Sequence, residues 1–174
     1  GFFSHPDIEN PNIALYDQIM ALEWIQKYVY FFGGDPSNVT LVGESAGAGG
    51  ISHLIASPLS KDLFHKAVHQ SGGSSFTYPA SSSNVRKLAN NFASSFKDPS
   101  IQHLKSISAE EILAVSEEVY AEHYFNYVED GFSMIGNLSD TFRSGNVKNV
   151  DLLIGSNNDE WSLYFDGNVN IGLW

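Results

Sequence analysis

The segment Gly43-Glu44-Ser45-Ala46-Gly47 has the clearest chemical potential in this sequence. It lies between a β-branched apolar run, Val39 to Val42, and a stretch of small residues that can continue as a helix to about Ala56. A serine hydroxyl is a weak nucleophile unless it is exposed, held in place and next to a base. A sharp turn from strand to helix raises a serine above the edge of a sheet, so this pattern predicts Ser45 as a nucleophile.

The same turn would aim the backbone amide of Ala46 at a developing oxyanion, an interaction worth ~3 kcal/mol at comparable sites. We expect Gly43 and Gly47 to leave room for the strained backbone and for the approaching helix. The alternatives are a glycine-rich turn and a phosphate-binding loop. A phosphate-binding loop requires Lys before its Ser or Thr, whereas Glu44 precedes Ser45 and its charge would repel phosphate.

Strands and helices alternate around this segment. A helix should begin at Ile13, capped by Asn12, and end at Gly33-Gly34. Buried strands are predicted at 39–42, 66–70 and 151–155. A loop at 72–84 separates the second strand from three predicted helices, at 84–96, 99–106 and 109–122. The pattern predicts an α/β fold, partial, with a mostly parallel sheet and a helical insert at about 82–123, within one domain over 1–174.

Composition excludes several classes of protein and site. The formal net charge is −11, and no cluster of Lys and Arg is present, which argues against a nucleic-acid partner. The absence of cysteine excludes disulfides and cysteine-based metal sites within the chain. No apolar run approaches the ~18 residues that a membrane span needs. No histidine lies within four residues of Asp159-Glu160, so we expect no metal there. Gly1 starts no signal peptide, and both ends look cut.

Beyond the pentapeptide, the chain resembles the type-B carboxylesterases, which include the cholinesterases. The resemblance covers most of residues 11 to 165 and is weakest between about 74 and 125. The segments that carry it are Asn12 to Gln18, Leu22 to Gln26, Phe32 to Pro36, Val39 to Ala48, Ser57-Pro58, Leu63-Phe64, Gln70 to Gly72, Asp130 to Phe132 and Gly155 to Glu160.

The resemblance implies the α/β-hydrolase fold and a serine hydrolase of small-molecule carboxylic esters that needs no cofactor. It assigns Ser45 as the nucleophile, Glu160 as the acid of the triad and Ala46 as one oxyanion donor. The family's catalytic histidine follows the acid, whereas all six histidines here precede Glu160. We therefore expect the base outside this chain and interpret His53, His65 and His69 as structural.

Two departures from the family pattern bear on rate and substrate. Gly49-Gly50 replaces a small residue followed by serine, and Trp161 stands where glycine is usual. A non-catalytic binding or adhesion module and an inactive fragment are the alternative functions, and the 174 residues alone should show no appreciable turnover. The resemblance favours the secretory pathway, with the cytoplasm as the alternative. A glycan would then fit Asn137-Leu138-Ser139 better than Asn38-Val39-Thr40, which leads into a strand. The sequence gives no oligomeric state.

Overall fold

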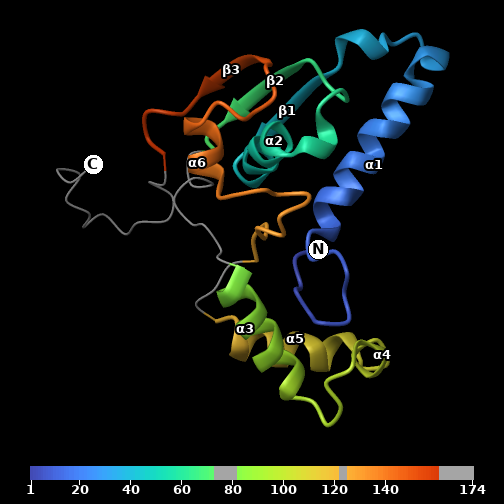
Figure 1. Cartoon of the computed structure of the whole chain (residues 1–174), viewed down its shortest axis with the longest axis vertical. Helices are drawn as coiled ribbons and strands as arrows, with labels where there is room; N and C mark the ends of the chain where they lie inside the picture. The colour runs from blue at the N-terminus through green and yellow to red at the C-terminus, as the bar shows by residue number, and fades with distance from the viewer. Residues whose placement is uncertain (73–81, 122–124, 161–174) are drawn as a thin grey trace.

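The computed structural model describes residues 1–72, 82–121 and 125–160 (Figure 1). Three strands form one sheet in the order β1-β2-β3, and both neighbouring pairs are parallel. The strands are β1 (Thr40–Glu44), β2 (Lys66–Gln70) and β3 (Asp151–Gly155). The predicted parallel sheet is confirmed, and the bounds of β2 and β3 are those expected. β1 begins one residue later and ends two residues later than expected.

Two helices form the layers above one face of the sheet. Helix α2 (Ala46–Ala56) packs on β1 and β2, and helix α1 (Ile13–Tyr28) packs on α2 (Figure 1). A short 3-10 helix, η1 (Val29–Phe32), extends α1 and ends at Gly33, whose φ of 81° suits the predicted glycine stop. No helix in the described part of the chain is both long enough and apolar enough to span a bilayer.

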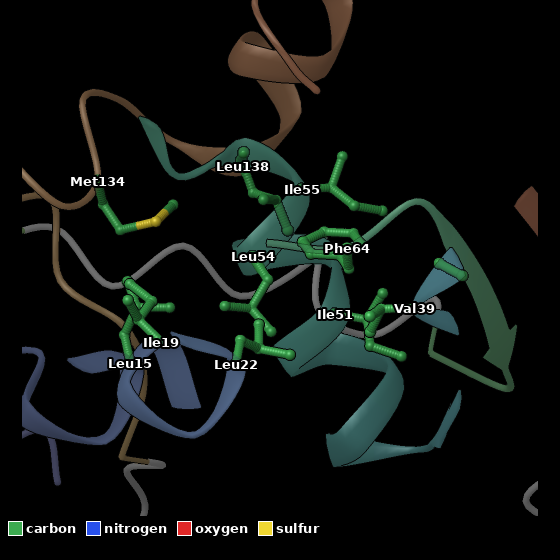
Figure 2. Close-up of a cluster of buried hydrophobic side chains, with 12 residues drawn as sticks. Leu15, Ile19, Leu22, Val39, Ile51, Leu54, Ile55, Phe64, Met134 and Leu138 are labelled. Carbon is green, nitrogen blue, oxygen red and sulfur yellow. The ribbon is translucent and has the colours of Figure 1, made fainter. Parts of the chain in front are cut away.

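The main hydrophobic core lies between α1, α2 and the sheet (Figure 2). Phe64 and Leu15 are fully buried in it. A third helix that sequence reasoning missed, α6 (Leu138–Arg143), packs on α2 and adds Leu138 to the same core. The other buried members are Ile19, Leu22, Val39, Ile51, Leu54, Ile55, Ala56, Ala67 and Met134.

The strands are much less buried than expected, which corrects the sequence-based prediction. Val42 is 68% exposed, and Leu153 is 67% exposed. Alternate residues of a strand face opposite sides of the sheet, so Val42 points away from the face that α2 covers. Every residue of β3 is exposed in the described structure. Only Ala67 and His69 of the central strand β2 are buried.

A second hydrophobic cluster joins three helices that Figure 1 shows apart from the sheet. They are α3 (Ser82–Ser94), α4 (Ile101–Leu104) and α5 (Ala109–Val119), each shorter than or shifted from its predicted range. The side chains of Ser100 and Ser108 cap α4 and α5. Most of the predicted loop at 72–84 and the end of the predicted insert lie outside the described residues, so the boundaries 82–123 stay a prediction.

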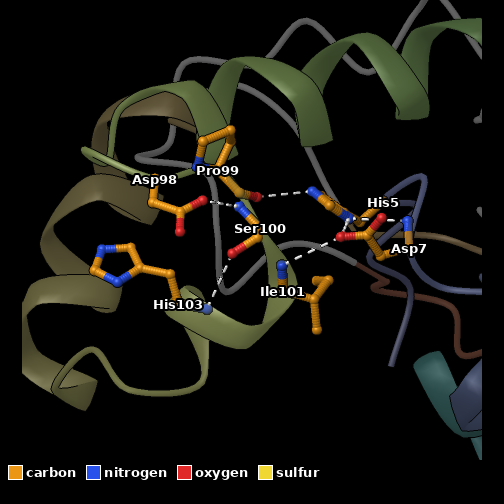
Figure 3. Close-up of polar contacts among 7 residues, drawn as sticks. All are labelled: His5, Asp7, Asp98, Pro99, Ser100, Ile101 and His103. Carbon is orange, nitrogen blue, oxygen red and sulfur yellow. Dashed lines mark hydrogen bonds and ion pairs between the residues drawn. The ribbon is translucent and has the colours of Figure 1, made fainter.

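The N-terminal segment connects to this helical part through polar contacts (Figure 3). His5 Nε2 donates to the carbonyl oxygen of Pro99 at 2.9 Å, and His5 Nδ1 accepts from the amide of Asp7 at 3.1 Å. These two contacts hold the His5 ring between the N-terminal segment and Pro99, which precedes α4. Phe3 adds an edge-to-face contact with Phe92, with ring centroids 5.4 Å apart.

Asn12 precedes α1, but its side chain makes no capping hydrogen bond, contrary to expectation. It is completely buried and instead bonds to a distant loop. Its Nδ2 donates to the carbonyl of Val128 at 2.8 Å and to Ser133 Oγ at 2.9 Å, while its Oδ1 accepts from the amide of Val128 at 2.8 Å. Asn12 therefore fixes the start of α1 against residues more than 100 positions away.

The two glycosylation sequences differ from expectation in their accessibility. Asn38 and Thr40 are both exposed, and only Val39 between them is buried, so the argument that a buried strand disfavours Asn38 is wrong. Asn137 is half-buried, and its side chain caps α6 by accepting from the amide of Asp140 at 2.9 Å. Glycosylation at either position stays a prediction.

The core makes a direct prediction about stability. Phe64→Ala should lower the free energy of unfolding of the whole protein by about 3–5 kcal/mol, because the ring is fully buried and its removal leaves a cavity. Phe31→Ala is the matched control: this ring is 77% exposed, so the change should stay within about 0.5 kcal/mol. Urea unfolding measures both, and equal losses would contradict the described core.

Candidate active site

Ser45 lies in the turn between β1 and α2 with φ 52° and ψ −116°. A positive φ is strained for a residue with a side chain, so the surrounding structure must hold it. The amide of Ser45 donates to the carbonyl of Gln70 at 2.9 Å, and its own carbonyl accepts from the amide of Gly49 at 3.0 Å. Ser45 is exposed, and its hydroxyl has no hydrogen-bond partner among the described residues. The turn therefore presents a hydroxyl to solvent at the carboxyl end of β1.

Only one of the two flanking glycines is required by close packing. A Cβ on Gly43 would lie 2.5 Å from the carbonyl carbon of Gly47, closer than any real contact allows. A Cβ on Gly47 would meet no described atom within 4 Å. The expectation that both glycines make room for the turn is thus correct for Gly43 and wrong for Gly47.

Ala46 is the first residue of α2 and is exposed beside Ser45. Amides in the first turn of a helix have no intrahelical acceptor, and they lie at the positive end of the helix dipole. The amide of Ala46 is therefore a suitable donor to an oxyanion next to the serine. Its role as such a donor stays a proposal.

Glu160 is held at the same edge of the sheet by Ser71, a residue that sequence analysis did not identify as part of the site. Ser71 Oγ donates a short hydrogen bond to Glu160 Oε1, and the amide of Asn157 donates to the same oxygen at 2.7 Å. The hydroxyl of Ser71, followed by the Asn157 amide, lowers the pKa of Glu160 from its ordinary value. Ser71 directly follows β2. Its position at the carboxyl end of a strand could have identified it as a candidate site residue from the sequence.

The ends of the three strands are joined across the sheet. Ser45 bonds through its amide to the carbonyl of Gln70, and Ser71 bonds through its amide to the carbonyl of Gly155 at 2.8 Å. Neighbouring strands are about 4.8 Å apart, so the ends of β1 and β3 are separated by about 10 Å. Ser45 and Glu160 follow the two outer strands of the sheet, and Ser71 follows the strand between them.

The histidines closest in sequence to Ser45 have other contacts. His53 is buried, donates from Nδ1 to the carbonyl of Gly49 at 2.8 Å and stacks on Tyr127 with ring centroids 3.7 Å apart. Burial lowers its pKa to about 4, which is far from the value a base needs at neutral pH. His65 Nδ1 accepts from the amide of Val39 at the opposite end of the sheet, and His69 is buried beneath α2.

Of the two departures from the family pattern, Gly49-Gly50 and Trp161, the structure describes only the first. A Cβ on Gly50 would lie 3.2 Å from the hydroxyl of Tyr127 and 3.3 Å from Gln18 Nε2. Tyr127 donates to Gln18 Oε1 at 3.3 Å, so a polar pair from other elements occupies the space beside the glycine. Trp161 lies outside the described residues. Within the described ranges no group of three potential metal ligands comes together.

Comparisons with known proteins agree with this architecture. Residues 1–170 match the profile of the Carboxylesterase family. The chain is 36% identical to human Carboxylesterase 5A over 168 residues, which covers 92% of this chain and 29% of that protein. It is 32% identical to a para-nitrobenzyl esterase of Bacillus subtilis (strain 168), over 88% of this chain and 33% of that one. A solved thermophilic PNB esterase superposes with a TM-score of 0.84 and 27% identity, over 98% of this chain and 37% of that one. The chain spans roughly a third of each of these three proteins.

The turn around Ser45 yields a paired prediction. Gly43→Ala should lower the free energy of unfolding of the whole protein by about 1–3 kcal/mol, because the new methyl group collides with backbone. Gly47→Ala should leave stability unchanged or raise it by up to about 1 kcal/mol, since alanine favours helix over glycine. Chemical unfolding of both variants is the measurement, and a larger loss at Gly47 would refute the described packing.

The Ser71–Glu160 contact predicts a pH-dependent stability difference. In the folded chain the pKa of Glu160 lies below its ordinary value of 4.5. The ionised carboxylate therefore stabilises the folded state at pH values above 4.5. Ser71→Ala removes the main cause. The wild type should exceed the variant in melting temperature at neutral pH, and the difference should shrink as pH falls through the folded pKa. Ser95→Ala is the control, because its hydroxyl bonds to the carbonyl of Asn91 and its effect should not vary with pH.

Proposed function

The chain belongs to the carboxylesterase family, and from this premise we propose that it supplies the nucleophile, the acid and one oxyanion donor of a serine carboxylic ester hydrolase. Ser45 is the proposed nucleophile, Glu160 the acid and Ala46 the oxyanion donor. The substrate is a small-molecule carboxylic ester. The base is a histidine that enters between Ser45 and Glu160 from outside the described residues.

In the proposed reaction Ser45 Oγ attacks the carbonyl carbon of the ester while its proton passes to the histidine. The amide of Ala46 donates to the negative oxygen of the tetrahedral intermediate. The carbon–oxygen bond to the alcohol then breaks, the alcohol leaves with the proton from the histidine, and Ser45 carries the acyl group. Water attacks the acyl-enzyme in the same manner and releases the carboxylic acid. Glu160 orients the imidazole and stabilises its charged form.

The observation that carries the proposal is the strained, exposed Ser45 at the carboxyl end of β1 on the same sheet edge as Glu160. Strained backbone at a solvent-exposed serine is typical of nucleophiles at strand-to-helix turns. The lowered pKa of Glu160 supports it, since an ionised carboxylate is what a triad acid must be at neutral pH. A binding or adhesion module would need neither feature, and both features favour catalysis.

Two substitutions in the whole protein test the assignment. Ser45→Ala should lower kcat for p-nitrophenyl acetate by about 10⁴–10⁶-fold, and Glu160→Gln by about 10⁴-fold, because each removes one member of a cooperating set. Asp159→Asn is the matched control at the neighbouring exposed carboxylate and should retain activity.

Covalent labelling gives an independent result. A fluorophosphonate should label the wild-type protein on the peptide that contains Ser45, with one label per chain. A label at another residue of a folded, active protein would remove Ser45 from the mechanism. No label and no burst of p-nitrophenol, with the fold intact, would favour the non-catalytic alternative.

A further inference from the structure

A polar contact lies in the buried layer beneath the candidate site. His69 of β2 and Ser52 of α2 are 4% and 2% exposed, and Ser52 Oγ lies 3.0 Å from His69 Nε2. Ser52 is about two helical turns beyond Ser45, and His69 is two residues before Ser71. This contact therefore joins the two elements that present the two serines, and the reaction proposed above makes no use of it.

The ring of His69 also supports the turn that follows β2. A Cβ on Gly72 would lie 2.4 Å from His69 Cε1 and 2.5 Å from the Cβ of Ala48. The backbone after β2 thus rests directly on the imidazole and on the first turn of α2. Ser71, between His69 and Gly72, has a φ of 53°, a value that the surrounding packing must impose. The same strained residue donates to Glu160.

Stability alone does not account for a histidine at this position. His69 Nδ1 is buried and has no hydrogen-bond partner among the described residues. A buried polar atom without a partner loses its hydration and regains nothing, whereas an apolar side chain of similar size would fill the space without this loss. The contacts of the described residues therefore give no stability reason for an imidazole here.

We propose that His69 is a positioning residue of the ester hydrolysis inferred above, and the proposal rests on that function. Through Ser52 it fixes helix α2, which carries Ser45 and the amide of Ala46. Through its contact with Gly72 it fixes the turn that directs Ser71 to Glu160. His69 touches neither the substrate nor the reacting atoms. It sets the distance between nucleophile and acid by holding α2 and β2 in one arrangement.

Replacing a positioning residue should lower kcat, because it changes the geometry of the chemical step. A displacement of about 1 Å in a catalytic group reduces rate by up to about 100-fold, even when the group itself is intact. Substrate affinity depends on other surfaces, so KM should change little. A merely structural residue would show the opposite pattern, because its loss lowers the melting temperature and leaves the kcat of the folded fraction unchanged.

The test compares three changes at these positions in the whole protein, with p-nitrophenyl acetate as substrate. His69→Leu should lower the kcat of the folded protein by about 10–100-fold with KM within about threefold, and it should also lower the melting temperature, because the buried Ser52 hydroxyl loses its partner. His69→Gln should restore most of kcat, because its side-chain amide can bond to Ser52. The double variant Ser52→Ala/His69→Leu removes both polar partners together, so it should fold at least as well as wild type and retain the low kcat.

His65→Leu is the matched control, because it makes the same change at the opposite end of β2 and should leave kcat unaltered. Wild-type kcat in a folded His69→Leu or in the double variant would overturn the proposal. So would a His69→Gln variant no better than His69→Leu, or a loss of kcat that follows only a loss of folded protein. If the wild type neither hydrolyses the ester nor reacts with a fluorophosphonate at Ser45, the proposed function is wrong. This result differs from those that overturn the role of His69, because they all require an active wild type.

Discussion

Parallel pairing brings the carboxyl ends of β1, β2 and β3 to one edge of the sheet, and the candidate site is built on that edge. Ser45, Ser71 and Glu160 come from the turns that follow the three strands in order. Backbone hydrogen bonds continue from strand to strand just beyond the sheet, from Ser45 to Gln70 and from Ser71 to Gly155. The pairing of the strands therefore brings the turns that carry nucleophile and acid to one edge, and the packing between α2 and β2 adjusts their positions.

Two of these residues have a positive φ, which costs about 1–3 kcal/mol each for a residue with a side chain. Both conformations are held in the same way: the amide of the strained residue donates to a carbonyl of the next strand. The first also requires glycine at position 43, where any side chain would collide with the start of α2. Strain and tight packing thus coincide at the residues that the chemistry needs, and stability is supplied by the core around Phe64 and Leu15.

Local sequence signals predicted the strands, the strained serine and α1, because β-branched runs, the Gly-x-Ser-x-Gly pattern and helical spacing act over a few residues. The missed features depend on residues far apart in the chain. Asn12 bonds to Val128 instead of capping α1, and Ser71 bonds to Glu160, which lies 89 positions further along the chain. The exposure of Val42 was also unpredictable, because burial of a strand depends on neighbours that the strand's own residues do not specify.

Helix α2 shows why the site depends on its surroundings. It contains Gly47, Gly49 and Gly50, and each glycine disfavours helix by about 1 kcal/mol relative to alanine. Packing compensates for this, since every residue from Ala48 to Ala56 is buried between the sheet, α1 and α6. The small residues allow that close approach, and at Gly50 they admit the hydroxyl of Tyr127. Because α2 depends on these contacts for its stability, it cannot shift without becoming less stable. The resulting rigidity keeps the amide of Ala46 and the hydroxyl of Ser45 in position to act on the same carbonyl group.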